Sequence, residues 1–162
     1  MALITIVRRL LVLTALMFWT GGFTFYAAVV VPVGAEVLGS HREQGYITQK
    51  VSNYLNVSGA VALLLLAWDA AATRDSSPWR CRSRWLTWLG MALSLAALVA
   101  LHLHLDALLA HESSAFPVSE FRPLHRLYLW TSTEQWGFAV LYTMLTICTW
   151  RAEDRGSVEG VR

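Results

Sequence analysis

The chain has 162 residues, of which 56% are apolar and only 15% are charged, and its formal net charge is +2. A soluble domain typically has about 45–50% apolar and about 25% charged residues, so this composition argues against a water-soluble globule, a disordered chain and a nucleic-acid-binding protein. Two cysteines are too few for a disulfide framework or a four-cysteine zinc site, and the composition indicates a protein of the lipid bilayer.

Four apolar stretches are long enough to cross a bilayer. A spanning helix needs about 20 mostly apolar residues, and only helices or closed barrels satisfy their backbone polar groups within lipid. The stretches are continuous runs and lack the alternation of a barrel strand. They cover, in chain order, approximately residues 10–33, 51–68, 85–109 and 128–150. The short connections leave no second domain, so the sequence predicts a single four-span domain over residues 1–162.

The basic residues are distributed unequally between the two ends of these spans. One set of ends carries nine arginines: Arg8, Arg9, Arg74, Arg80, Arg82, Arg84, Arg151, Arg155 and Arg162. The other carries four basic residues: Arg42, Lys50, Arg122 and Arg126. Because cytoplasmic ends are enriched in Lys and Arg, we expect both termini to be cytoplasmic. The predicted fold is an all-α, antiparallel four-helix bundle in a bacterial inner (plasma) membrane.

Histidines and acids gather at the predicted outer end of the spans. Ionisable groups within a membrane are costly, so they usually face a bundle interior and find partners there. His102 and Asp106 lie one turn apart on one helix face, and we expect Glu134 to meet one of them from the last span. The predicted polar cluster comprises His41, Asn53, Asn56, His102, Asp106, His125, Glu134 and Gln135. No comparable group is expected at the cytoplasmic end, where the arginines are interpreted as topology determinants.

Three interpretations of this cluster remain open. The first is a structural network of hydrogen bonds, to which Asn53, Asn56 and Gln135 contribute. The second is a zinc or copper site, because histidines and carboxylates suit both metals, although the spacing matches no strong motif. Its candidate ligands are His41, His102, Asp106, His125 and Glu134. The third is a wet, protonatable pathway for a proton or a small solute.

Two short segments resemble a known family. The first is GGFTFYAAVVVP at residues 21–32, followed by a polar connection and VSNY at 51–54; the second is FRPLHR at 121–126. They resemble the small four-span family of unknown function that includes transmembrane protein 205-like proteins. The resemblance implies an integral membrane protein without an established activity. A looser similarity to four-span copper-resistance membrane domains, which place histidines near the periplasmic end, supports a test for metal.

No nucleophile elbow, Walker loop, HExxH or CxxC motif is present, so the sequence offers no candidate catalytic nucleophile. The sequence favours a non-enzymatic integral membrane protein that acts as a subunit or accessory factor. The alternative is metal-ion handling or small-solute transport through the outer cluster. An enzyme is the third alternative, because a set of His, Asp and Glu side chains in a membrane pocket could bind a catalytic metal. The expected partners are the lipid bilayer and either other membrane proteins or a second copy of the chain, and no nucleic acid is expected.

Overall fold

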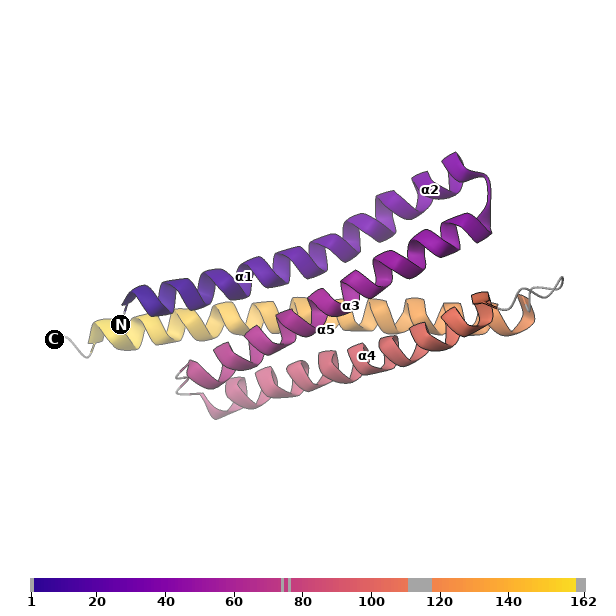
Figure 1. Ribbon diagram of the computed structural model, residues 1–162. Helices are drawn as coiled ribbons and strands as arrows, with labels where there is room; N and C mark the ends of the chain where they lie inside the picture. Colours follow the sequence, from indigo (N-terminus) through magenta and orange to yellow (C-terminus); the bar gives the residue numbers. More distant parts are fainter. Residues whose placement is uncertain (1, 74, 76, 111–117, 160–162) are drawn as a thin grey trace.

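The computed structural model describes residues 2–73, 75, 77–110 and 118–159, which contain helices and no strand. They form four long helical rods (Figure 1). The first rod joins α1 (Ala2–Phe25), the π-helical turn η1 (Tyr26–Val30) and α2 (Val31–Leu38); the others are α3 (His41–Ala72), α4 (Pro78–Ala110) and α5 (Val118–Glu159). Consecutive rods run in opposite directions. The start of α1 and the end of α5 lie at the same end of the molecule, here called the termini end, and the other is the distal end.

The first rod continues through a proline because a wider turn precedes it. Pro32 has no backbone N–H, and its ring crowds the carbonyl group four residues earlier in an α-helix. The turn at Tyr26–Val30 adopts π geometry directly before this position, and the helix then resumes as α2. A π turn inserts one extra residue into a helix, which relieves such a conflict without ending the helix.

The connections are shorter than the sequence predicts. We expected a link over residues 34–50, but the structure leaves only Gly39 and Ser40 between α2 and α3. Gly39 has a φ of 59°, a left-handed conformation that suits glycine at the end of a helix. The Ser40 hydroxyl accepts a hydrogen bond from the Glu43 backbone N–H and caps α3. The polar residues that follow are therefore helical.

The core lies along the middle of the rods. It contains buried side chains from all four: Val12, Leu16, Trp19, Ala62, Leu63, Leu66, Met91, Leu95, Ala139, Tyr142 and Trp150. Two glycines allow close approach of neighbouring rods. A Cβ atom on Gly59 would lie 2.8 Å from the Trp19 ring, and one on Gly90 would lie 3.0 Å from the Phe138 ring. Small residues at helix contacts are typical of packing within a membrane.

Within the described residues, three segments are long and apolar enough to cross a membrane: Leu3–Leu38, Glu43–Ala72 and Pro78–Leu108. Large apolar side chains also cover the outside of the rods, including Met17, Phe18 and Leu64, each 72% exposed. Such an apolar exterior is unusual for a soluble monomer and suits lipid. The helical, membrane-protein character predicted from the sequence is thus supported, whereas the crossing by α5 stays a prediction.

Candidate functional site

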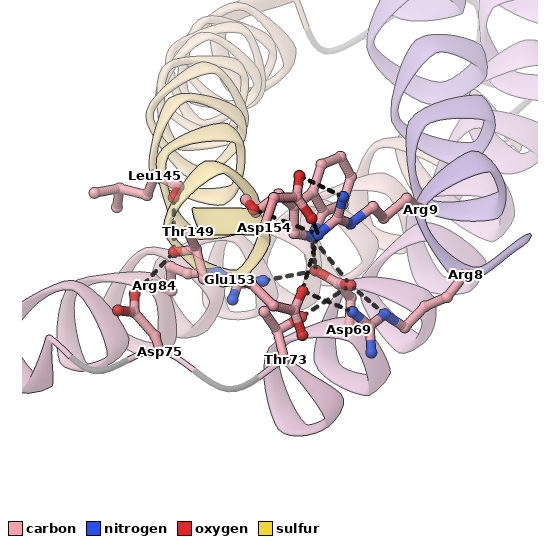
Figure 2. Close-up of polar contacts among 11 residues, drawn as sticks. Arg8, Arg9, Asp69, Thr73, Asp75, Arg84, Leu145, Thr149, Glu153 and Asp154 are labelled. Atoms are coloured by element: carbon pink, nitrogen blue, oxygen red, sulfur yellow. Dashed lines mark hydrogen bonds and ion pairs between the residues drawn. The ribbon is translucent and has the colours of Figure 1, made fainter. Parts of the chain in front are cut away.

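The most deeply buried charge of the described chain is at the termini end. Asp69, on the last turn of α3, is completely buried, and Figure 2 shows arginines reaching it from two other rods. Arg8 Nε of α1 lies 2.9 Å from one carboxylate oxygen, and Arg84 Nη2 of α4 lies 2.8 Å from the other. The Trp150 indole N–H donates to Asp69 at 3.2 Å, and the Thr73 hydroxyl donates at 3.2 Å. These five residues are the Asp69 network, which joins all four rods.

A second layer of ion pairs fastens the start of α1 to the end of α5. Arg9 Nη2 lies 2.9 Å from Glu153 and 2.8 Å from Asp154, and Arg8 Nη2 lies 3.4 Å from Glu153. The backbones of α1 and α5 come close at few positions. The ion pairs therefore supplement a limited backbone approach and the core packing between these two rods.

The α3–α4 connection is held in the same region by Asp75. Its carboxylate accepts two hydrogen bonds of 2.7 Å from Arg80 and one of 3.0 Å from the Thr149 hydroxyl of α5. The Arg80 guanidinium, together with the Ser77 backbone N–H and the Thr149 hydroxyl, lowers the pKa of Asp75 from 3.8 to about 2. The connection and α5 are thus joined by a carboxylate that stays ionised.

The buried charges in this region are paired, and their pairing explains why they are tolerated. An isolated buried charge is very unfavourable, whereas a paired and hydrogen-bonded one is acceptable. Arg84 also donates to the Tyr142 hydroxyl at 3.4 Å, and that hydroxyl donates to the Leu66 carbonyl at 2.9 Å. The arrangement binds the helices to one another and directs its donors and acceptors inward.

The sequence analysis missed this network. It expected no ionisable group at this end comparable to the outer cluster, and that expectation is wrong. The available signal was the position of Asp69 and Arg84, an acid and an arginine that flank the ends of two adjacent predicted spans at the same depth. The count of basic residues treats Arg84 only as a determinant of membrane orientation, and it contains no information on whether Arg84 and Asp69 face each other.

At the distal end, the structure brings together part of the predicted cluster. His102 Nε2 lies 3.3 Å from Asp106, as the one-turn spacing predicts. Tyr128 of α5 interacts with the Ser52 hydroxyl of α3 and with the charge of Asp106. Tyr26 of η1 donates a 2.9 Å hydrogen bond to Thr48 of α3. Hydroxyl-bearing residues that were not predicted from the sequence therefore contribute polar contacts at this end, and one of them, Tyr128, interacts with Asp106.

Other predicted members of the cluster are placed separately. Glu134 lies on an exposed face of α5 and has no hydrogen bond or ion pair with the described residues, so the expected contact with His102 or Asp106 is not observed. Asn53 is exposed and Asn56 is buried on α3. Gln135 is buried and donates to the Met91 carbonyl of α4 at 3.2 Å, as expected of a structural polar residue.

Two predicted histidines remain. His125 is half-buried and stacks on Phe121, with ring centroids 5.6 Å apart, and burial lowers the pKa of its imidazole. His41 begins α3, but its side chain lies outside the described part of the structure. Within the described residues, no three His, Cys, Asp or Glu side chains are grouped closely enough to hold a metal ion.

An open groove of about 690 Å³ separates α1 and η1 from α5. The first wall carries small or apolar residues: Thr20, Gly21, Thr24, Phe25, Ala28 and Val29. The α5 wall carries Trp136, Ala139, Val140, Thr143 and Met144. Figure 1 shows α1 and α2 inclined away from α5 toward the distal end. We call this hollow the α1–α5 groove.

Comparisons of the chain with protein-family models, with curated proteins and with solved structures give no match.

Proposed function

We propose that the chain is a non-enzymatic integral membrane protein with four spans and both termini in the cytoplasm, and that it acts as a subunit or accessory factor. In this proposal α5 is the fourth span of an antiparallel bundle in a bacterial inner membrane. Membership of the four-span family that its sequence resembles would fit this architecture. Nine basic residues against four at the two sets of ends support the orientation.

The observation that carries the proposal is the Asp69 network. Its carboxylate is fully buried and its arginines are directed inward, so these charges hold helices together and present no open site to a substrate. The surface left for interaction is the apolar exterior, including the α1–α5 groove. A protein whose charges are buried and whose exterior is apolar is suited to contacts with other proteins within the membrane plane.

Cysteine labelling tests the topology. Cys81 and Cys148 are both exposed, so the reporter variants carry Cys148→Ser, and all but the Cys81 reporter also carry Cys81→Ser. A membrane-impermeant maleimide should label Glu43→Cys in intact cells, but label Cys81 and Gly156→Cys only after permeabilisation. The reverse pattern would invert the proposed orientation, and labelling of Glu43→Cys and Gly156→Cys from the same side would contradict an even number of spans.

The accessory role is tested by gentle solubilisation of native membranes. We expect the chain to co-purify with a defined membrane partner at constant stoichiometry. A chain that elutes alone under every mild detergent would contradict this part of the proposal.

A second candidate, metal-ion or small-solute handling, is favoured by the contact between His102 and Asp106 and by the interaction of Asp106 with Tyr128. It predicts stoichiometric zinc or copper in the purified protein and its loss in His102→Ala/Asp106→Ala. Metal-free protein whose stability is unchanged by added zinc or copper would exclude the metal branch.

A further inference from the structure

One face of α5 carries two arginines and then an exposed apolar strip that leads into the α1–α5 groove. Arg122 and Arg126 are exposed and one turn apart. At about 3.6 residues per turn, about five whole turns separate Arg122 from Val140 in the groove wall, so they share a helix face. Between them this face carries Leu129, 51% exposed, and Trp136, 42% exposed.

The two arginines have no acidic partner in the part of the chain that the structure describes. No hydrogen bond or ion pair joins Arg122 or Arg126 to a described residue, whereas Arg8, Arg9, Arg80 and Arg84 are all paired. Two like charges one turn apart repel each other, and an anion bound between them removes that repulsion. Guanidinium groups suit phosphate in particular, because their fork of donors matches two phosphate oxygens.

The length of the strip constrains the lipid that could occupy it. Trp136 lies about 15 Å below Arg126 along the helix, at about 1.5 Å per residue, and Met144 lies about 27 Å below it. One leaflet of a bilayer core is about 15 Å thick. An ordinary phospholipid tail, with its headgroup at Arg126, would therefore end where the groove begins. Only a longer tail could fill the groove.

We propose that the α1–α5 groove and the Arg122–Arg126 pair bind an anionic lipid whose tail is longer than one leaflet, the chemistry of a polyprenyl phosphate. The phosphate is held by the two guanidinium groups at the distal end. The tail follows the apolar strip past Trp136 and enters the groove, whose small residues leave room for it. Figure 1 shows α1 and α2 inclined away from α5 toward the distal end, where this path begins. The inference rests on the proposed function in one respect, namely that α5 crosses the membrane.

Native mass spectrometry of the full-length protein in detergent tests this proposal with four probes. Undecaprenyl phosphate has both required properties, farnesyl phosphate has only the headgroup, undecaprenol has only the tail, and dioleoylphosphatidylglycerol is anionic with tails of one leaflet. We expect undecaprenyl phosphate to be retained at least about tenfold more tightly than each of the others, the difference that 1.4 kcal/mol produces.

Matched variants separate the two contacts. Arg122→Gln/Arg126→Gln should weaken retention at least about tenfold, since charge-assisted hydrogen bonds to the phosphate are lost. Arg82→Gln/Arg155→Gln removes the same charge from exposed positions near the other end and should leave it unchanged. Ala28→Leu fills the groove and should also weaken binding, whereas Ala97→Leu on an exposed face of α4 should not.

Several outcomes would overturn the lipid proposal. They are equal retention of farnesyl phosphate or phosphatidylglycerol, equal effects of the two arginine pairs, or equal effects of the two alanine variants. Disulfide-linked dimers formed through Ala28→Cys, in a background lacking both native cysteines, would assign the groove to a second copy and also overturn it. Because binding is measured in detergent, these results are distinct from a failure of the proposed topology, which cysteine labelling detects separately.

Discussion

Replacement of Asp69 by asparagine is the most informative perturbation of the termini end. Asparagine has nearly the same shape, so the change removes one negative charge with little change in volume. It leaves Arg84, whose side chain is only 3% exposed, without a carboxylate partner, and it leaves Arg8, which is 8% exposed, with only the 3.4 Å contact to Glu153. Removing one partner of a buried ion pair typically costs about 3–5 kcal/mol, because the remaining charge stays desolvated. We expect Asp69→Asn to destabilise the fold by about this amount.

The control is Asp154→Asn, which is the same chemical change at a carboxylate 61% exposed. An exposed ion pair of this kind contributes at most about 1 kcal/mol. Reversible unfolding in mixed micelles of increasing SDS content, followed by circular dichroism, measures both variants under identical conditions. If Asp69→Asn falls within about 1 kcal/mol of Asp154→Asn, the carboxylate does not hold these arginines and the structural role assigned to it is refuted.

Three further predictions concern packing, an unpaired amide and pH. Gly59→Ala should destabilise the protein by about 1–3 kcal/mol, because its Cβ would lie 2.8 Å from an indole ring, whereas Gly137→Ala, with open space around the glycine, should not; thermal unfolding in detergent compares the two. The Gln44 side-chain amide is buried and its two polar atoms have no hydrogen-bond partner, so Gln44→Met should be neutral or stabilising. Gln135→Met instead loses the hydrogen bond to the Met91 carbonyl and should cost about 1 kcal/mol of stability in the same assay. The pKa of Asp75 is lowered from 3.8 to about 2, so its contribution to stability is present above pH 4 and is lost as the pH falls toward 2. Asp75→Asn should therefore reduce the pH dependence of the unfolding midpoint between pH 4 and pH 2. An unchanged pH dependence in this variant would contradict the role assigned to Asp75.

The helices were largely predictable because a segment that crosses the lipid core needs a long, continuous apolar run, and such runs are visible in the sequence. The predicted spans 10–33 and 51–68 fall within segments that are long and apolar enough to cross a membrane, and the predicted span 85–109 extends one residue past the third such segment, Pro78–Leu108. Their ends were not predictable in the same way, because hydropathy detects only the part of a helix that matches lipid. The polar residues 41–50 continue α3 beyond that depth, and their start is fixed by the Ser40 cap.

The candidate site was only partly predictable. The His102–Asp106 contact follows from helical spacing within one segment, which the sequence specifies directly. The contact expected for Glu134 depended on how α5 is rotated against α4, and a rotation that buries Gln135 leaves Glu134 exposed. The Asp69 network depends on the mutual approach of all four rods, and such side-chain convergence is not encoded in the periodicity of any one of them.

The π turn at Tyr26–Val30 sets the rotational phase of everything that follows it in the first rod. Deleting one residue from this turn would restore α geometry and leave α2 in its present phase, whereas continuous α geometry through the same residues would rotate α2 around its axis by about 100°. Gly34, which now lies against the Gln44 side chain, would then be replaced at that contact by a neighbour bearing a Cβ atom. The surplus residue in the π turn thus sets which side of α2 faces α3. With it, small side chains of the first rod face α3 both before and after Pro32.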